Sequence, residues 1–124
     1  MKVLFLDDDR IRHDALDESL SGCTSEVWHV YSAENAIQAI GTQRFDLICL
    51  DFDLGTGASN GSVAAKAVAS LDEDRRPDRV LLHTHNRDGA MSMASHLKPT
   101  GIWQRWYPFG STFLQIVKSL VEWG

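Results

Sequence analysis

Five short apolar runs alternate along the chain with segments whose apolar residues recur every three to four positions. Runs of the first kind are typical of buried strands, and the second spacing is typical of amphipathic helices. Their alternation predicts βα units, in which parallel strands form one sheet that helices cover on both faces. We therefore expect an α/β fold with a doubly wound, five-stranded parallel sheet.

The boundaries of these elements follow from the pattern. The expected strands are 2–7, 27–31, 45–51, 79–84 and 102–107, and the expected helices are 11–20, 33–41, 62–71, 90–97 and 112–123. Ser32 and Ser111 are expected helix N-caps, because a short side-chain oxygen accepts a hydrogen bond from a first-turn amide. The length fits one domain, 1–124, with no second domain or linker.

Composition and charge narrow the class of protein. Hydrophobic residues make up 44% of the chain and charged residues 23%, which is ordinary for a globular protein and excludes a disordered one. The net charge of −5 argues against a broad nucleic-acid surface, although a local phosphate pocket is compatible with it. Cys49 lies in an apolar strand and is expected to be a buried thiol, with Cys23 elsewhere. No leader or membrane span is expected, so we predict a reduced, cytoplasmic protein.

Polar residues follow the first, third and fourth expected strands where these strands end. They are Asp7, Asp8 and Asp9, then Asp51 and Asp53, and finally His83, Thr84, His85 and Asn86. The ends of parallel strands meet at one edge of an open α/β sheet, so these side chains are expected to converge there. The loop 53–61, rich in Gly, Ser, Thr and Asn, lies on the same edge. The sequence thus predicts a functional site.

The acidic members of this cluster predict a divalent cation. Neighbouring carboxylates repel one another unless a cation neutralises them, and hard ions such as Mg²⁺ take oxygen ligands. Asp7, Asp8 and Asp51 are therefore expected to hold Mg²⁺ or Mn²⁺.

His83 and His85 are the expected catalytic pair. Side chains two positions apart on an extended strand face the same way, about 7 Å apart. One imidazole could activate water and the other could protonate a leaving oxygen, as transfer at phosphorus requires. The alternative is a packed or surface histidine pair.

Other residues near the site have structural alternatives. Asp9 is expected to cap the first helix rather than to bind metal, and Asp53 fits a turn as well as a ligand contact. Asn60 and Asn86 could simply be the N-caps of the third and fourth helices. Even then, the helix N-termini would offer amides to an anion.

The acidic pattern resembles the receiver domain of two-component response regulators over essentially the whole chain. Leu6-Asp7-Asp8-Asp9 matches the acidic motif after the first strand, Asp51 matches the phospho-acceptor, and Thr84 matches the hydroxyl residue after the fourth strand. The resemblance implies a flavodoxin-like, three-layer receiver fold. Where a receiver ends its fifth strand in lysine and proline, this chain has Tyr107-Pro108, and Lys98-Pro99 falls one segment too early. Phosphorylation of Asp51 would therefore lack the usual lysine.

A second resemblance is closer, because several motifs coincide. The chain is similar to the cyclic-phosphate processing receiver-like family in Asp7-Asp8-Asp9, Arg12-His13, Leu50 to Gly55, Asn60-Gly61 and His83 to Asn86. It departs at Phe52, where that family would be expected to have a histidine. The resemblance implies a metal-assisted phosphoesterase that acts on a cyclic nucleotide or on a 2′,3′-cyclic phosphate at an RNA end, in RNA repair or conflict. It also implies substrate contacts from Arg12, His13, Asp53, Asn60, Thr84 and Asn86.

Two alternatives stay open beside the enzyme. One is a non-catalytic signalling receiver, which Thr84 favours and Tyr107 disfavours, and the other is a sensor that binds a cyclic nucleotide without cleaving it. Trp28, Trp103, Trp106 and Trp123 are explained better by core or partner packing than by base stacking. By resemblance to receivers, a homodimer through the fifth strand and last helix is expected.

Overall fold

A computed structural model of the protein describes residues 1–123. The five strands are β1 (Lys2–Leu6), β2 (Glu26–Val30), β3 (Leu47–Leu50), β4 (Arg79–Leu82) and β5 (Trp103–Trp106). The helices are α1 (Arg10–Ser19), α2 (Ala33–Thr42), α3 (Gly61–Ala69), α4 (Arg87–Leu97) and α5 (Ser111–Trp123), with 3₁₀ turns η1 (Glu73–Arg75) and η2 (Lys98–Thr100). The expected alternation of strands and helices is confirmed.

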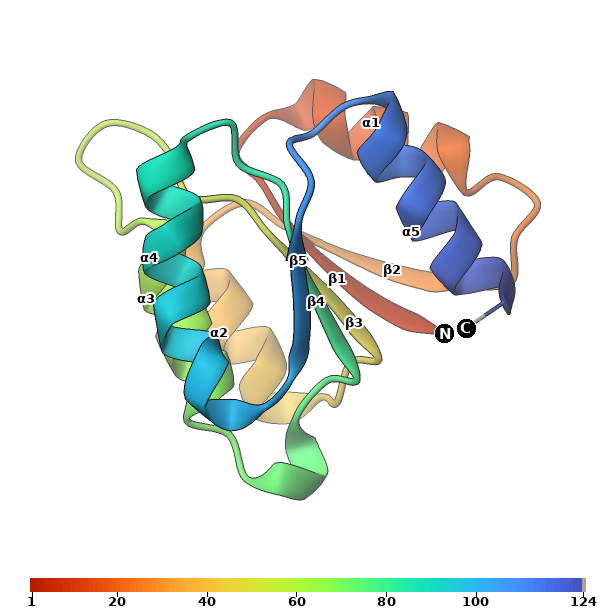
Figure 1. Ribbon diagram of the computed structural model, residues 1–124. Helices are drawn as coiled ribbons and strands as arrows, with labels where there is room; N and C mark the ends of the chain where they lie inside the picture. Colours follow the sequence, from red (N-terminus) through yellow and green to blue (C-terminus); the bar gives the residue numbers. More distant parts are fainter. Residues whose placement is uncertain (124) are drawn as a thin grey trace.

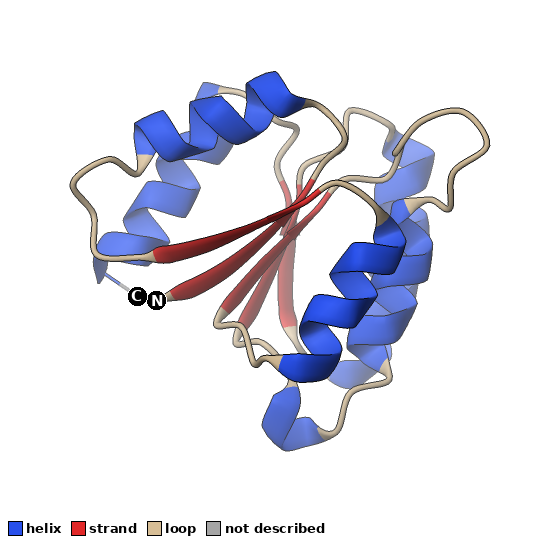
Figure 2. Ribbon diagram, turned by 180° about the vertical axis from the view of Figure 1, so that it is seen from behind, coloured by secondary structure: helices blue, strands red, loops and turns tan. Residues whose placement is uncertain are grey.

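The strands form one parallel sheet in the order β2-β1-β3-β4-β5. Helices α2, α3 and α4 cover one face, and α1 and α5 cover the other (Figure 1). The view from behind shows the same three layers, with the sheet between two helical layers (Figure 2). This is the doubly wound, five-stranded parallel sheet that the sequence predicted, and its strand order is the flavodoxin-like one that the resemblance implied.

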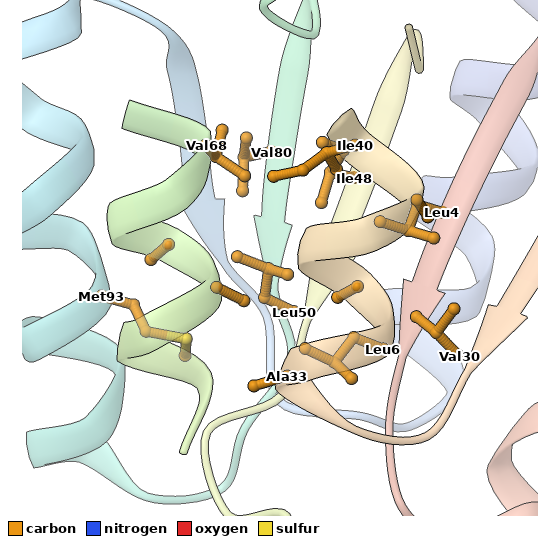
Figure 3. Packing of buried hydrophobic residues seen from close by; sticks show 14 of the residues in the cluster. Leu4, Leu6, Val30, Ala33, Ile40, Ile48, Leu50, Val68, Val80 and Met93 are labelled. Atoms are coloured by element: carbon orange, nitrogen blue, oxygen red, sulfur yellow. The ribbon is translucent and has the colours of Figure 1, made fainter. Parts of the chain in front are cut away.

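Apolar residues at even-numbered positions of the central strands form the larger core. Leu4 and Leu6 of β1 and Ile48 and Leu50 of β3 pack with Val80 and Leu82 of β4 against α2, α3 and α4. Figure 3 shows Ile40, Val68 and Met93 of these helices meeting the strand residues. Near-complete burial of these side chains stabilises the fold by about 1.5–3 kcal/mol for each large one.

The odd positions of the same strands face α1 and α5. Phe5, Cys49 and Leu81 belong to this second core, which Phe113 and Val117 of α5 complete. Side chains alternate along a strand, so residues two positions beyond Phe5, Cys49 and Leu81 continue toward the same side. Those residues are Asp7, Asp51 and His83. The pleat of the sheet thus brings three polar residues together.

Strand ends are where the expected boundaries differ from the structure. Every strand ends one or two residues earlier than expected, so that β4 ends at Leu82 and β3 at Leu50. At these strand ends, the polar side chains of Asp7, Asp51 and Thr84 accept hydrogen bonds from backbone N–H groups of the loops. These bonds compete with the hydrogen bonds between neighbouring strands. Ser32 caps α2 as expected, through a bond from the Asn35 N–H to its hydroxyl (3.1 Å). Ser111 is the first residue of α5 rather than the residue before it.

Two tryptophans lie on the surface near the carboxyl-terminal elements. Trp106 is 40% exposed on β5 and Trp123 is 86% exposed on α5. The homodimer expected through this face stays a prediction. Within residues 1–123, no helix combines the length and the apolar character needed to cross a bilayer.

Candidate functional site

A pocket of about 570 Å³ lies at the carboxyl ends of β1, β3 and β4. The loop between β3 and α3, which projects beyond the strands in Figure 1, contributes to its wall. The lining residues are Asp8, Asp9, Arg12, Asp51, Asp53, Gly55, Thr56, Thr84 and His85. The structure therefore brings together six residues predicted for the site: Asp8, Arg12, Asp51, Asp53, Thr84 and His85.

Asp7 lies beneath this pocket and is fully buried. Its Oδ1 accepts the Asp9 N–H (2.8 Å), and its Oδ2 accepts from His83 Nε2 (3.0 Å) and from Arg12 Nη1 (3.3 Å). Burial alone would raise the pKa of Asp7, but the bonds from His83 and Asp9 and the positive charge of Arg12 outweigh it and lower that pKa. Asp7 is thus held as a carboxylate.

Asp51 has the opposite electrostatic environment. Burial and the neighbouring Asp7 carboxylate raise its pKa, although the Phe52 N–H (2.8 Å to Oδ1), His83 and Arg12 act against the shift. Two carboxyls of one site therefore differ in how readily they hold a proton. Such a divergence is typical of functional sites.

His83 is fully buried among aromatic rings. It stacks on Phe5 (4.7 Å between centroids) and contacts Phe113 (5.0 Å) and Phe109 (6.1 Å). Its Nε2 bonds to Asp7, whereas its Nδ1 has no hydrogen-bond partner within residues 1–123. Because Asp7 is held as a carboxylate that can only accept, His83 donates this bond from Nε2. His83 therefore holds Asp7 in place.

His85 has a different environment, because it is exposed and lines the pocket. Its Nε2 lies 2.9 Å from the carbonyl oxygen of Phe109. A carbonyl only accepts, so Nε2 carries the proton and Nδ1 of the neutral ring is left as a base. This is the arrangement in which a second group orients a general base.

The expectation that His83 and His85 lie side by side as a catalytic pair is wrong in its geometry. The extended strand ends at Leu82, so the alternation that would align the two rings does not continue. One ring is sealed in the core and the other opens to the pocket. Of the two, the structure brings only His85 to the pocket.

Arg12 provides the positive charge nearest the carboxylates. Its Nη1 lies 3.3 Å from Asp7 Oδ2 and 3.6 Å from Asp51 Oδ2, and its Nε lies 3.9 Å from Asp9 Oδ2. The guanidinium also lies over the Phe109 ring, 5.3 Å from its centroid. Asp9 caps α1, as expected, by accepting the Ile11 N–H (2.9 Å). This cap sets the helix turn that aims Arg12 at the site.

His13 lies outside the pocket, contrary to its expected substrate contact. It is 2% exposed, its Nε2 lies 2.7 Å from the Asp7 carbonyl oxygen, and its Nδ1 lies 2.6 Å from Nδ1 of His29. Nε2 of His29 in turn lies 2.8 Å from Asp17. Because both outer partners are acceptors, the two rings need three N–H protons between them. Burial, the largest influence, lowers the pKa of His13.

Asn60 and Asn86 begin helices, which was the alternative considered for both. Asn60 Oδ1 accepts the Ser62 N–H (2.9 Å) at the start of α3, and Asn86 Oδ1 accepts the Gly89 N–H (3.0 Å) at the start of α4. Neither lines the pocket. Asn86 Nδ2 also lies 3.4 Å from Asp53 Oδ2, and this contact positions a pocket carboxylate.

The residues that could hold a cation are the acidic ones. Ligand atoms of Asp7, Asp51 and His83 lie within 4.8 Å of one another, and Asp8 lines the adjoining pocket. His83 uses Nε2 on Asp7, so it fits the role of a group that orients a ligating carboxylate better than that of a ligand. The carboxylate oxygens of Asp7, Asp8 and Asp51 fit a hard divalent cation.

A family model described as the cyclic-phosphate processing receiver domain matches residues 2–99. The chain belongs to this family. The resemblance seen in its motifs is thereby confirmed. The match spans β1 to η2 and so includes every residue predicted for the site.

Solved receiver domains share the fold of this member of the family. The Mn²⁺-bound form of the response regulator Rcp1 has a TM-score of 0.73 at 18% identity, over 99% of this chain and 96% of its own. The receiver domain of the sensor histidine kinase PA1611 from Pseudomonas aeruginosa PAO1, with magnesium in its active-site cleft, has a TM-score of 0.70 at 19% identity. The match covers 99% of this chain and 98% of that domain. The N-terminal domain of a response regulator/sensory box/GGDEF three-domain protein from Carboxydothermus hydrogenoformans has a TM-score of 0.72 at 22% identity. The match covers 98% of this chain and 91% of that domain. No curated protein matches the chain.

Three features of the site were missed in the sequence. The contact of His29 with His13 required pairing β2 beside β1, which local patterns do not specify. Gly55 and Thr56 line the pocket from the loop 53–61. The predicted place of this loop at the same sheet edge was the sequence feature that could have identified them. The aromatic contacts of Phe109 depend on where the turn after β5 folds back.

Proposed function

We propose that this protein is a metal-assisted phosphoesterase that opens a cyclic phosphate, such as a cyclic nucleotide or a 2′,3′-cyclic phosphate at an RNA end. The observation that carries the proposal is a single pocket that combines carboxylates, one guanidinium and one oriented imidazole. A cation site, a phosphate ligand and a base are the groups that hydrolysis at phosphorus requires. The family description agrees with this chemistry.

The proposed chemistry begins with water activation. His85 Nδ1 removes a proton from water while Nε2–H stays bonded to the Phe109 carbonyl, which fixes the ring. The water oxygen attacks phosphorus, one ring P–O bond breaks, and the alkoxide that leaves takes a proton from the imidazolium directly or through solvent. The product is a phosphomonoester with a free hydroxyl. Arg12 binds the non-bridging oxygens, because a guanidinium matches phosphate in charge and geometry.

A divalent cation would be held by Asp7, Asp8 and Asp51. When bound, it supplies positive charge that polarises the phosphoryl oxygens and stabilises the charge that develops on them. Receiver domains of the same fold with Mn²⁺ or magnesium bound support a cation at the acidic edge of this one. His83 keeps Asp7 ionised and fixed for this role.

The test is turnover of 2′,3′-cyclic AMP and of RNA ending in a 2′,3′-cyclic phosphate, with Mg²⁺ or Mn²⁺, followed by ³¹P NMR. We expect ring opening by the natural protein and a loss of about 10²–10⁴-fold in His85→Ala. His96→Ala, on α4 and away from the pocket, is the matched control and should keep full activity. Absence of ring opening by the natural protein in every combination would reject the phosphoesterase.

A non-catalytic sensor or signalling module is the second candidate, and one contact favours it. Trp106 Nε1 donates to the carbonyl oxygen of Thr84 (2.8 Å), which joins a pocket residue to a 40% exposed aromatic on β5. A ligand that moves Thr84 would thus alter a surface available to a partner. Binding of 2′,3′-cyclic AMP that changes Trp106 fluorescence, without turnover, would favour this function over the enzyme.

A further inference from the structure

The guanidinium of Arg12 lies where a positive ion would be expected in a cluster of carboxylates. It is shared among Asp7 (3.3 Å), Asp51 (3.6 Å) and Asp9 (3.9 Å). Asp7 is fully buried and the Asp51 side chain is 6% exposed, so neither has much water to screen its charge. The acidic site is therefore partly neutralised by the chain itself.

Arg12 faces one oxygen of each of two carboxylates that could hold a cation. The Oδ1 atoms of Asp7 and Asp51 accept the backbone N–H groups of Asp9 and Phe52, both at 2.8 Å. Nη1 of Arg12 lies near both Oδ2 atoms, and the Oδ2 of Asp7 also accepts a hydrogen bond from His83 Nε2 (3.0 Å). A divalent ion held by these two carboxylates would lie close to the like charge of the guanidinium. Occupation by the ion therefore requires the guanidinium to move.

The position of Arg12 allows such a movement and provides a second use for the side chain. Its side chain is 27% exposed and lines the pocket, so the flexible stem can turn outward without breaking the core. In its present position the guanidinium lies over the Phe109 ring, 5.3 Å from its centroid. A guanidinium freed of carboxylates is a strong ligand for phosphate oxygens.

We propose that Arg12 and a divalent cation occupy the acidic site alternately, and that the displaced guanidinium then binds the phosphate. This inference rests on the proposed function and orders its binding steps: the cation enters first and prepares the phosphate ligand. Without the cation, Arg12 keeps the buried carboxylates neutralised and remains withdrawn from the phosphate.

The test is isothermal titration at low ionic strength with MgCl₂ alone, and with orthophosphate in saturating Mg²⁺. Arg12→Ala should bind Mg²⁺ about tenfold more tightly, which corresponds to about 1.4 kcal/mol, and should bind orthophosphate about tenfold more weakly. Arg10→Ala is the matched control, because Arg10 is an exposed arginine two positions earlier on the same helix. It should change neither affinity.

Arg12→Lys is a second variant that keeps the test decisive if Arg12→Ala fails to fold. It keeps the charge and should retain the natural Mg²⁺ affinity, while a single ammonium binds orthophosphate more weakly than the planar guanidinium does. The opposite signs expected for Mg²⁺ and phosphate in Arg12→Ala distinguish competition from a purely structural role, which would weaken both.

An unchanged or weaker Mg²⁺ affinity in Arg12→Ala overturns the inference, as does an absence of Mg²⁺ binding in both proteins. These titrations do not depend on turnover. A natural protein that shows the expected titrations but opens no cyclic phosphate would overturn the phosphoesterase and leave the role of Arg12 standing.

Discussion

His83 donates its Nε2 proton to Oδ2 of Asp7 across 3.0 Å, and both side chains are fully buried. The two residues are 76 positions apart in the chain and come from the ends of β4 and β1. Because β3 lies between these strands in the sheet, Asp51 shares their small polar cluster. This bond joins a buried, ionised carboxylate to an imidazole that aromatic rings surround.

His83→Phe is expected to destabilise the protein by about 2 kcal/mol, because it removes a donor from a buried carboxylate while filling the same aromatic cage. Urea denaturation at pH 7 measures the change, with His96→Phe on α4 as control. The pKa of Asp7 is lowered in the fold, so its contribution to stability is present above its ordinary pKa of 3.8 and is lost as pH falls through the folded value. The natural protein should therefore lose more stability than His83→Phe in that acid range. Equal stability of the two at pH 7 would contradict this assignment.

Asp51→Asn should stabilise the metal-free protein by about 1 kcal/mol, or raise Tm by about 3–5 °C, because burial and the Asp7 carboxylate oppose its charge. The pKa of Asp51 is raised in the fold, so the folded state keeps this proton to a higher pH than the unfolded state does. The folded state therefore loses stability as the pH rises from the ordinary pKa through the folded value. The advantage of Asp51→Asn should therefore disappear below pH 3.8, the ordinary pKa of the group. Thermal unfolding in EDTA across pH 3–8 measures this, with exposed Asp53→Asn as the matched control. A variant that is less stable than the natural protein at pH 7 would show that Asp51 is satisfied by its neighbours.

His13→Phe should lower the free energy of unfolding by about 1–3 kcal/mol, because it leaves the Asp7 carbonyl and His29 Nδ1 without their partner. Its affinity for orthophosphate should stay within about twofold of the natural protein, since His13 does not line the pocket. Denaturation and titration of the same sample separate the two effects. A loss of phosphate affinity at unchanged stability would restore the substrate contact first predicted for His13.

Gly61→Ala should destabilise the protein by about 3 kcal/mol, because a Cβ there would overlap the Asp51 carbonyl oxygen and press on the Met93 sulfur (2.9 Å). The Asp51 backbone would have to shift, so Mg²⁺ affinity should fall as well. Gly41→Ala is the matched control, since nothing lies within 4 Å of a Cβ built on this α2 residue. It should be neutral or stabilising by up to about 1 kcal/mol. Equal effects of the two substitutions would refute the close packing of α3 on Asp51.

The fold was predictable because each of its elements leaves a local pattern. The apolar runs that contain Leu4, Ile48 and Val80 could only be buried strands once helical spacing was found between them. Parallel strands place their ends at one edge, so the gathering of Asp51, Thr84 and His85 in one pocket also followed from local order. The positions at which the strands stop were less predictable, because loop hydrogen bonds determine them.

What the sequence by itself determined is the residue content of the site and the edge of the sheet where it forms. Only the tertiary structure decided that His83 is buried while His85 lines the pocket, because the aromatic cage of His83 is assembled from β1, α5 and the loop before α5. The same holds for Arg12 on α1, whose guanidinium comes within 3.6 Å of Asp51, the residue after β3, only in the folded chain. Burial and charge pairing between distant segments depend on how the chain folds in three dimensions. The local periodicity of the sequence therefore does not predict them.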